Sequence, residues 1–123
     1  MSNLWRALLF TGVASVTCLA YAADVGGKWT TSFDTQVGKQ SYTYEFKVQG
    51  ATLTGTAKGS LITDSVLSDG KVDGNKLSFV EKGSYMGMPL SFNYTGELVG
   101  DEIHFKRELM GFPAEEFVAK RAK

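Results

Sequence analysis

Two ionisable side chains fall on strand faces that are otherwise apolar. In LSFVE (77–81), Glu81 takes the position that follows two alternate apolar residues, and in IHFKR (103–107) Arg107 does the same. Alternate residues of a strand point to the same side of a sheet, so both charges should point into the core. An unpaired buried ion costs several kcal/mol. The sequence therefore predicts that Glu81 and Arg107 form an internal pair.

Tyrosine hydroxyls are expected beside this pair. Tyr44 and Tyr94 lie as many residues from the ends of their hairpins as Glu81 and Arg107 do. If the strands align, all four side chains meet inside the protein. Such a cluster can be a structural pair that satisfies itself, an anchor for the polar head of a ligand, or an acid–base pair. The sequence leaves these alternatives open.

Other chemistry has few candidates. His104 is the one histidine of the chain and falls on an outward face, so a zinc site or a Ser-His triad lacks parts. We therefore expect no catalytic residue, no metal ligand and no cofactor. The 13 Lys and Arg residues balance 13 Asp and Glu residues without a basic stripe, which argues against a nucleic-acid partner.

Alternation of apolar and polar residues extends along most of the chain. YTYEFKV (42–48) and MPLSFNYTGEL (88–98) each set an apolar face against a polar one, as half-buried antiparallel strands do. Alternation is poorest in SLITDSVLS (60–68). The expected strands are 27–34, 41–48, 52–59, 64–72, 76–83, 88–98, 102–109 and 115–121.

Three segments repeat one hairpin design, with a central Gly between aliphatic residues: VQGATL (48–53), VDGNKL (72–77) and LVGDEI (98–103). Glycine supplies the positive φ that a tight hairpin needs. Short connections make the strands an up-and-down meander, and closure removes its two edges. We expect an all-β fold, an eight-stranded antiparallel barrel, with an antiparallel β-sandwich as the alternative.

The remaining loops should share the end opposite the Gly hairpins. Both Met-Gly-x-Pro turns, YMGMP (85–89) and LMGFP (109–113), lie there. Their apolar side chains either plug the barrel or form the gate to a site beneath the turns.

The N-terminal segment has the pattern of a secretory signal peptide. Arg6 precedes the apolar run ALLFTGVASVTCLA (7–20), and Ala20-Tyr21-Ala22 fits an A-x-A cleavage signal. We expect a signal peptide at 1–22 and a mature domain at 23–123. The protein would then be periplasmic or extracellular, without a transmembrane anchor in the mature chain.

The start of the first expected strand, GGKW (26–29), resembles the G-x-W signature of lipocalins and related calycin barrels. The resemblance implies that Gly27, Trp29 and Arg121 close one end of the barrel, with the arginine packed on the indole. Most of the mature chain resembles a small lipocalin-like domain common in secreted bacterial proteins.

Three functions follow as hypotheses. The first is the binding of a small apolar molecule at the open end of the barrel. The second is a protein-interaction, inhibitor or accessory module that uses the apolar rim. The third and minor one is an isomerase- or cyclase-like enzyme that uses Glu81. The expected ligand-binding residues are Tyr44, Glu81, Met86, Met88, Phe92, Tyr94, Arg107 and Phe112. Many inward aromatic residues argue for little spare volume, so the sequence leaves open whether the interior is filled or hollow.

Overall fold

The computed structural model describes residues 25–122, so the signal peptide predicted for 1–22 lies outside the described residues. Eight strands make up the fold: β1 (Gly27–Thr35), β2 (Gly38–Gln49), β3 (Thr52–Gly59), β4 (Thr63–Asp73), β5 (Lys76–Tyr85), β6 (Met88–Val99), β7 (Glu102–Glu108) and β8 (Glu115–Arg121). Within the described residues, no helix is long and apolar enough to cross a membrane.

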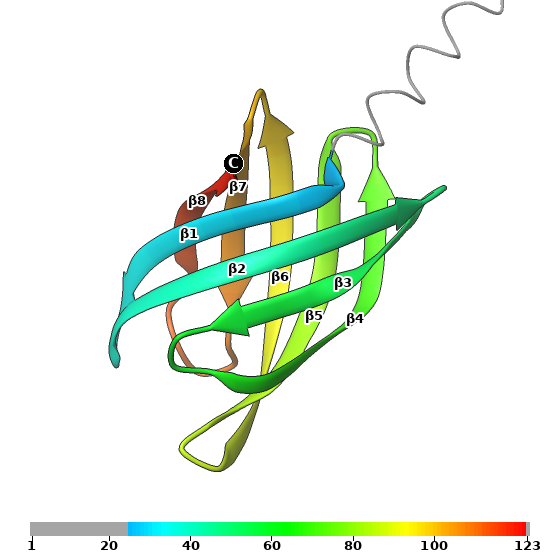
Figure 1. Ribbon diagram of the computed structural model, residues 1–123. Coiled ribbons are helices and arrows are strands. Elements are labelled where there is room, and N and C mark those ends of the chain that lie inside the picture. Colours follow the sequence, from blue (N-terminus) through cyan, green and yellow to red (C-terminus); the bar gives the residue numbers. More distant parts are fainter. Residues whose placement is uncertain (1–24, 123) are drawn as a thin grey trace, which may run out of the picture.

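The strands form a closed antiparallel barrel in which each strand pairs with the next one in the chain (Figure 1). Closure comes from β1 and β8, where Trp29 faces Arg121 and Thr30 faces Lys120. The predicted all-β, eight-stranded barrel is confirmed, and the sandwich alternative is wrong because β1 and β8 leave no open edge.

The turns sort into two ends, as the meander requires. Gly50, Gly74 and Gly100 begin two-residue turns with φ of 61°, 62° and 63°, and these three turns share what we call the closed end. The connections 36–37, 60–62, 86–87 and 109–114 share the opposite end, which we call the open end (Figure 1).

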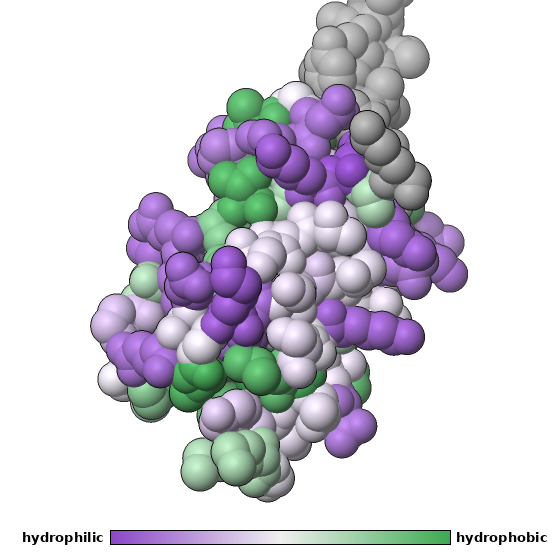
Figure 2. All heavy atoms as spheres, turned by 60° about the vertical axis from the view of Figure 1, so that its left-hand side comes forward, coloured by the Kyte–Doolittle hydropathy of each residue, from purple (hydrophilic) through white to green (hydrophobic). Residues whose placement is uncertain are grey.

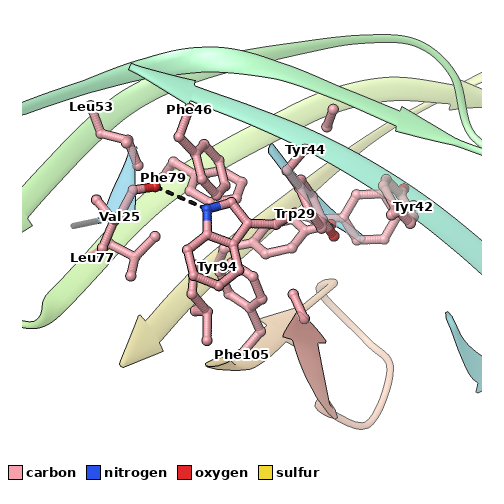
Figure 3. Close-up of a cluster of buried hydrophobic side chains, with 14 of the residues drawn as sticks. Val25, Trp29, Tyr42, Tyr44, Phe46, Leu53, Leu77, Phe79, Tyr94 and Phe105 are labelled. Atoms are coloured by element: carbon pink, nitrogen blue, oxygen red, sulfur yellow. Dashed lines mark hydrogen bonds between the residues drawn. The ribbon is translucent and has the colours of Figure 1, made fainter. Parts of the chain in front are cut away.

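Aromatic side chains fill the closed half of the barrel. Along β2, Phe46, Tyr44 and Tyr42 stack at centroid distances of 5.6 and 5.2 Å. Phe79 on β5 stacks at 4.4 Å on Tyr94, its register partner on the neighbouring strand β6. Figure 3 shows this cluster running from Val25, near the closed end, to Tyr42. These rings pack against one another and make this half of the interior an apolar core.

Strand β4 departs from regular geometry. It pairs with β3 only at Thr52 and Lys71, and its register with β5 shifts between Thr63 and Val66. Asp64 in this bulge has a φ of 56°. A bulge re-aims side chains, which explains the poor alternation and brings Ser65 to the core.

The closed end is sealed around Trp29, which is fully buried and donates its indole N–H to the Val25 carbonyl at 3.0 Å. The Arg121 guanidinium lies 4.3 Å from the centre of the indole ring and donates to the Gly26 carbonyl at 3.0 Å. Gly27 has a φ of 117°, and a Cβ there would lie 3.3 Å from the Arg121 guanidinium. Gly27 therefore permits both the backbone turn and the close approach of Arg121.

Replacing Arg121 with Met should lower the free energy of unfolding by about 1 kcal/mol, because it removes the cation–π contact and the bond to Gly26. Urea denaturation measures this loss. Lys120→Met is the matched control: it is the neighbouring cation on β8, its side chain is 73% exposed, and it should cost less than about 0.5 kcal/mol. Equal losses in the two variants would contradict this role of Arg121.

Candidate functional site

A cavity of about 510 Å³ opens at the open end of the barrel. Its wall is mostly apolar, whereas its polar groups are few. The apolar lining includes Val37, Ile62, Tyr85, Met88, Leu90, Phe92, Leu109, Phe112 and Pro113, and the polar lining includes Asp34, Gln40, Arg107 and Glu115. The cavity lies beneath the Met-Gly-x-Pro turns and ends at Arg107.

A buried polar layer separates the cavity from the aromatic half of the core. Its centre is Glu81, which is 0% exposed. Three hydroxyls donate to the Glu81 carboxylate: Tyr42 at 2.9 Å, Tyr94 at 2.7 Å and Ser65 at 2.5 Å. These donors replace the water that the carboxylate loses on burial.

Arg107 forms the other side of this layer. Its Nη1 donates to the hydroxyls of Tyr42 and Tyr94 at 3.1 and 3.4 Å. Its Nε and Nη2 both lie 2.7 Å from one oxygen of Glu115. All three nitrogens of the guanidinium are thus engaged, although the residue is only 1% exposed.

The predicted direct pair of Glu81 and Arg107 is therefore wrong in its geometry. The two charges are linked through the hydroxyls of Tyr42 and Tyr94, and the ion pair of Arg107 is with Glu115. The prediction counted residues from the end of each hairpin separately. Such a count ignores the offset between neighbouring hairpins that closing a barrel requires. That offset places the two tyrosines between the charges.

The hydrogen bonds of the layer run in one direction. Each linking tyrosine accepts from Arg107 and donates to Glu81. Because Tyr94 commits its one proton to Glu81, the Tyr44 hydroxyl must be the donor in its 3.1 Å bond with Tyr94. The order from cation through hydroxyl to carboxylate lets every proton point toward negative charge, so the layer is satisfied without a direct contact of the two ions.

Burial also fixes the protonation of the tyrosines. It raises the pKa of Tyr44 and of Tyr94 well above the ordinary value. For Tyr42, burial and then the charge of Glu81 raise the pKa. Burial alone would lower the pKa of the Arg107 guanidinium. The contacts of Arg107 with Tyr94 and Glu115 have a larger effect, so the pKa is raised. Neutral tyrosines and a charged arginine are the states that the hydrogen bonds require.

Aromatic faces surround the guanidinium. Its central carbon lies 4.1 Å from the centre of the Phe92 ring and 5.0 Å from that of Phe33. Phe33 in turn stacks on Phe117 at 3.8 Å. Cation–π attraction of this kind stabilises a desolvated arginine and holds it at the floor of the cavity.

The eight expected ligand-binding residues fall into three places. Met88, Phe92, Arg107 and Phe112 line the cavity. Glu81, Tyr44 and Tyr94 lie in the buried layer or beneath it, outside the lining. Met86 is 87% exposed and also outside the lining, because the 86–87 turn has positive φ at both residues and carries this side chain away from the barrel. Figure 2 shows exposed hydrophobic residues, in green, at the lower end where this turn lies.

Sequence reasoning missed two members of the site, Glu115 and Gln40. The sequence pattern gives no sign that Glu115 belongs to the site, yet Glu115 faces Arg107 across β7 and β8 and forms an ion pair with it. Gln40 shares the inward face of β2 with Tyr44 and with Tyr42, which the alternation of 42–48 had already placed inside. The same alternation that placed Tyr44 could have found Gln40, but β2 was expected to begin at 41.

Comparisons with known proteins give one remote likeness. No family model matches the chain, and no curated protein matches it. A solved structure described as "REP1-NXSQ fatty acid transporter" is similar, with a TM-score of 0.47 and 17% identity, over 83% of this chain and 98% of that one. Similarity at this level says nothing about what the present chain binds.

The buried tyrosines should make the protein sensitive to alkali. Because the folded protein keeps hydroxyl protons that the unfolded chain releases above a pH of about 10, the free energy of unfolding should fall as the pH rises beyond that value. Tyr44→Phe removes one such group. The free energy of unfolding of this variant should therefore fall less steeply with pH than that of the wild type. The two slopes should differ by up to about 1.4 kcal/mol per pH unit.

Urea denaturation of both proteins, at neutral pH and across the alkaline range, measures the two slopes. The comparison at neutral pH is the control, since it gives the cost of losing the hydroxyl itself. Parallel slopes in alkali would show that the Tyr44 hydroxyl ionises as easily in the folded protein as in the unfolded chain.

Proposed function

We propose that this chain is a small lipocalin-like binding protein that takes up a small apolar molecule in its open-end cavity. The observation that carries the proposal is the cavity itself. Its volume of about 510 Å³ lies within the range of about 300–1,000 Å³ that is usual for pockets of small ligands. Apolar walls with a few polar groups at one end are also typical of such pockets.

The division of the interior supports this proposal. The closed half is filled by aromatic rings, so the hollow half is not a general result of poor packing. Leu90, Leu109 and Phe92 present carbon to the cavity, and an apolar ligand would remove these surfaces from water. Met88 at the mouth is flexible and adapts to ligands of different shape.

We further propose that the protein acts outside the cytoplasm. The support is the N-terminal pattern of Arg6, an apolar run and Ala20-Tyr21-Ala22. A periplasmic or extracellular carrier of apolar molecules would meet them in water, where they are poorly soluble and a buried site is useful.

A second candidate function is a protein-interaction module. Met86 and Met110 are 87% and 95% exposed and lie outside the cavity lining, and exposed apolar groups at a rim are common in protein contacts. The enzyme hypothesis has weaker support, because Glu81 is surrounded by hydroxyl donors and does not line the cavity.

Nile red, a neutral dye that fluoresces in apolar surroundings, should bind to the purified protein at one saturable site. The double variant Met88→Asp, Phe112→Asp places two charges on the cavity lining and should weaken dye binding at least about tenfold, since each carboxylate resists desolvation. A fluorescence titration measures the dissociation constants.

The matched control is Met86→Asp, Met110→Asp, which adds the same charges at the same end but outside the lining. It should leave dye affinity within about twofold. Absence of saturable binding by the wild type, or equal loss in both double variants, contradicts the proposed cavity site. A protein partner lost only by the second variant favours the interaction module.

A further inference from the structure

The cavity contains one buried acceptor without a partner. Gln40 is 2% exposed and lines the cavity, and its Oε1 has no hydrogen-bond partner among the described residues. Buried polar atoms are almost always paired, so an orphan acceptor on a residue that lines a cavity points to a partner from outside the chain. An oxygen of this kind requires a donor, N–H or O–H.

The hydrogen bonds at Thr35 determine which way the Gln40 amide points. Thr35 donates its one hydroxyl proton to the Gly38 carbonyl at 2.7 Å and accepts from the Val37 amide at 3.2 Å. Toward Gln40 it can therefore only accept, and Gln40 Nε2 donates to it at 3.4 Å. The reversed amide would set two acceptors against each other, so Oε1 must be the free end.

The charges at the floor disfavour an anionic ligand. All three nitrogens of the Arg107 guanidinium are engaged, two of them with Glu115. Asp34 and Glu115 also line the cavity, and Glu81 lies directly beneath it. A ligand carboxylate would have to displace Glu115 from Arg107. It would still lie near Asp34 and Glu81, whose negative charges would repel it.

We infer that the cavity selects neutral molecules with an apolar body and a hydrogen-bond donor head, such as an alcohol, and discriminates against carboxylates. This inference rests on the proposed binding function and names the class of ligand for that site. In the bound state the head donates to Gln40 Oε1, the apolar body lies along Leu90, Phe92 and Leu109, and the pair of Arg107 and Glu115 stays intact.

Three probes of equal chain length separate the possibilities: decanol, decyl methyl ether and decanoate. Each is titrated against the Nile red complex at neutral pH, where the carboxylic acid is ionised. Decanol should displace the dye at about tenfold lower concentration than the ether, which keeps the oxygen but cannot donate, because a ligand without a donor leaves Gln40 unpaired. Decanoate should be weaker than decanol by at least the same factor.

Two pairs of variants locate the effect. Gln40→Leu should remove the preference for decanol over the ether, measured as the ratio of the two displacement constants within that variant, whereas Gln49→Leu, at an exposed position of the same strand, should keep the preference. Glu115→Gln should strengthen decanoate binding about tenfold by freeing Arg107, and Glu116→Gln, its exposed neighbour on β8, should not. The probe series on the wild type tests the inference even if a variant fails to fold.

The possible outcomes are distinct. Equal affinity for alcohol and ether, or tightest binding of decanoate by the wild type, overturns the inference but keeps the proposed apolar site, since the dye is still bound and displaced. Failure of the wild type to bind the dye overturns the proposed function and this inference together.

Discussion

The structure depends on how two opposite charges are kept inside a small barrel. Glu81 and Arg107 are 0% and 1% exposed, and each would be strongly unfavourable alone. They are held by a set of one-way hydrogen bonds in which Tyr42 and Tyr94 accept from the cation and donate to the anion. Glu115 forms an ion pair with Arg107, and both residues line the cavity. The charges are thus satisfied as one network.

This polar layer divides the barrel into two halves with different roles. On the closed side, stacked rings and the Trp29–Arg121 contact make a solid core. On the open side, the strands enclose a cavity whose floor is the guanidinium with its carboxylate partner. The guanidinium of this floor is held by hydrogen bonds to Tyr42, Tyr94 and Glu115, so the proposed binding site depends on the same network that stabilises the fold.

Much of this arrangement follows from sequence alternation. The alternation of apolar and polar residues placed Glu81, Arg107, Tyr44 and Tyr94 inside. Because the Gly hairpins alternate with the other connections along the chain, the sequence also assigned each turn to its end of the barrel. Alternation could not show whether Glu81 and Arg107 touch directly, because one of the two tyrosines between them, Tyr42 on β2, lies 39 residues from Glu81 and 65 from Arg107 in the chain.

The other differences also have local physical causes. The β4 bulge turns Ser65 toward Glu81 against the simple alternation. The left-handed backbone of Met86 moves that side chain out of the cavity lining. The partner of Arg107 was missed because the six-residue connection 109–114 determines the register of β8, and only that register sets Glu115 opposite Arg107.

The central claim is that Glu81 and Arg107 stabilise each other through intervening hydroxyls, and a double-mutant cycle tests it most directly. The free energies of unfolding of Glu81→Gln, Arg107→Met and the double variant are measured by urea denaturation at neutral pH. Each single change should cost about 3–5 kcal/mol, as the loss of one partner of a buried pair does. The double change should cost less than the sum by more than about 1 kcal/mol, although the two side chains form no direct ion pair. Losses that add to within about 0.5 kcal/mol would contradict the claim.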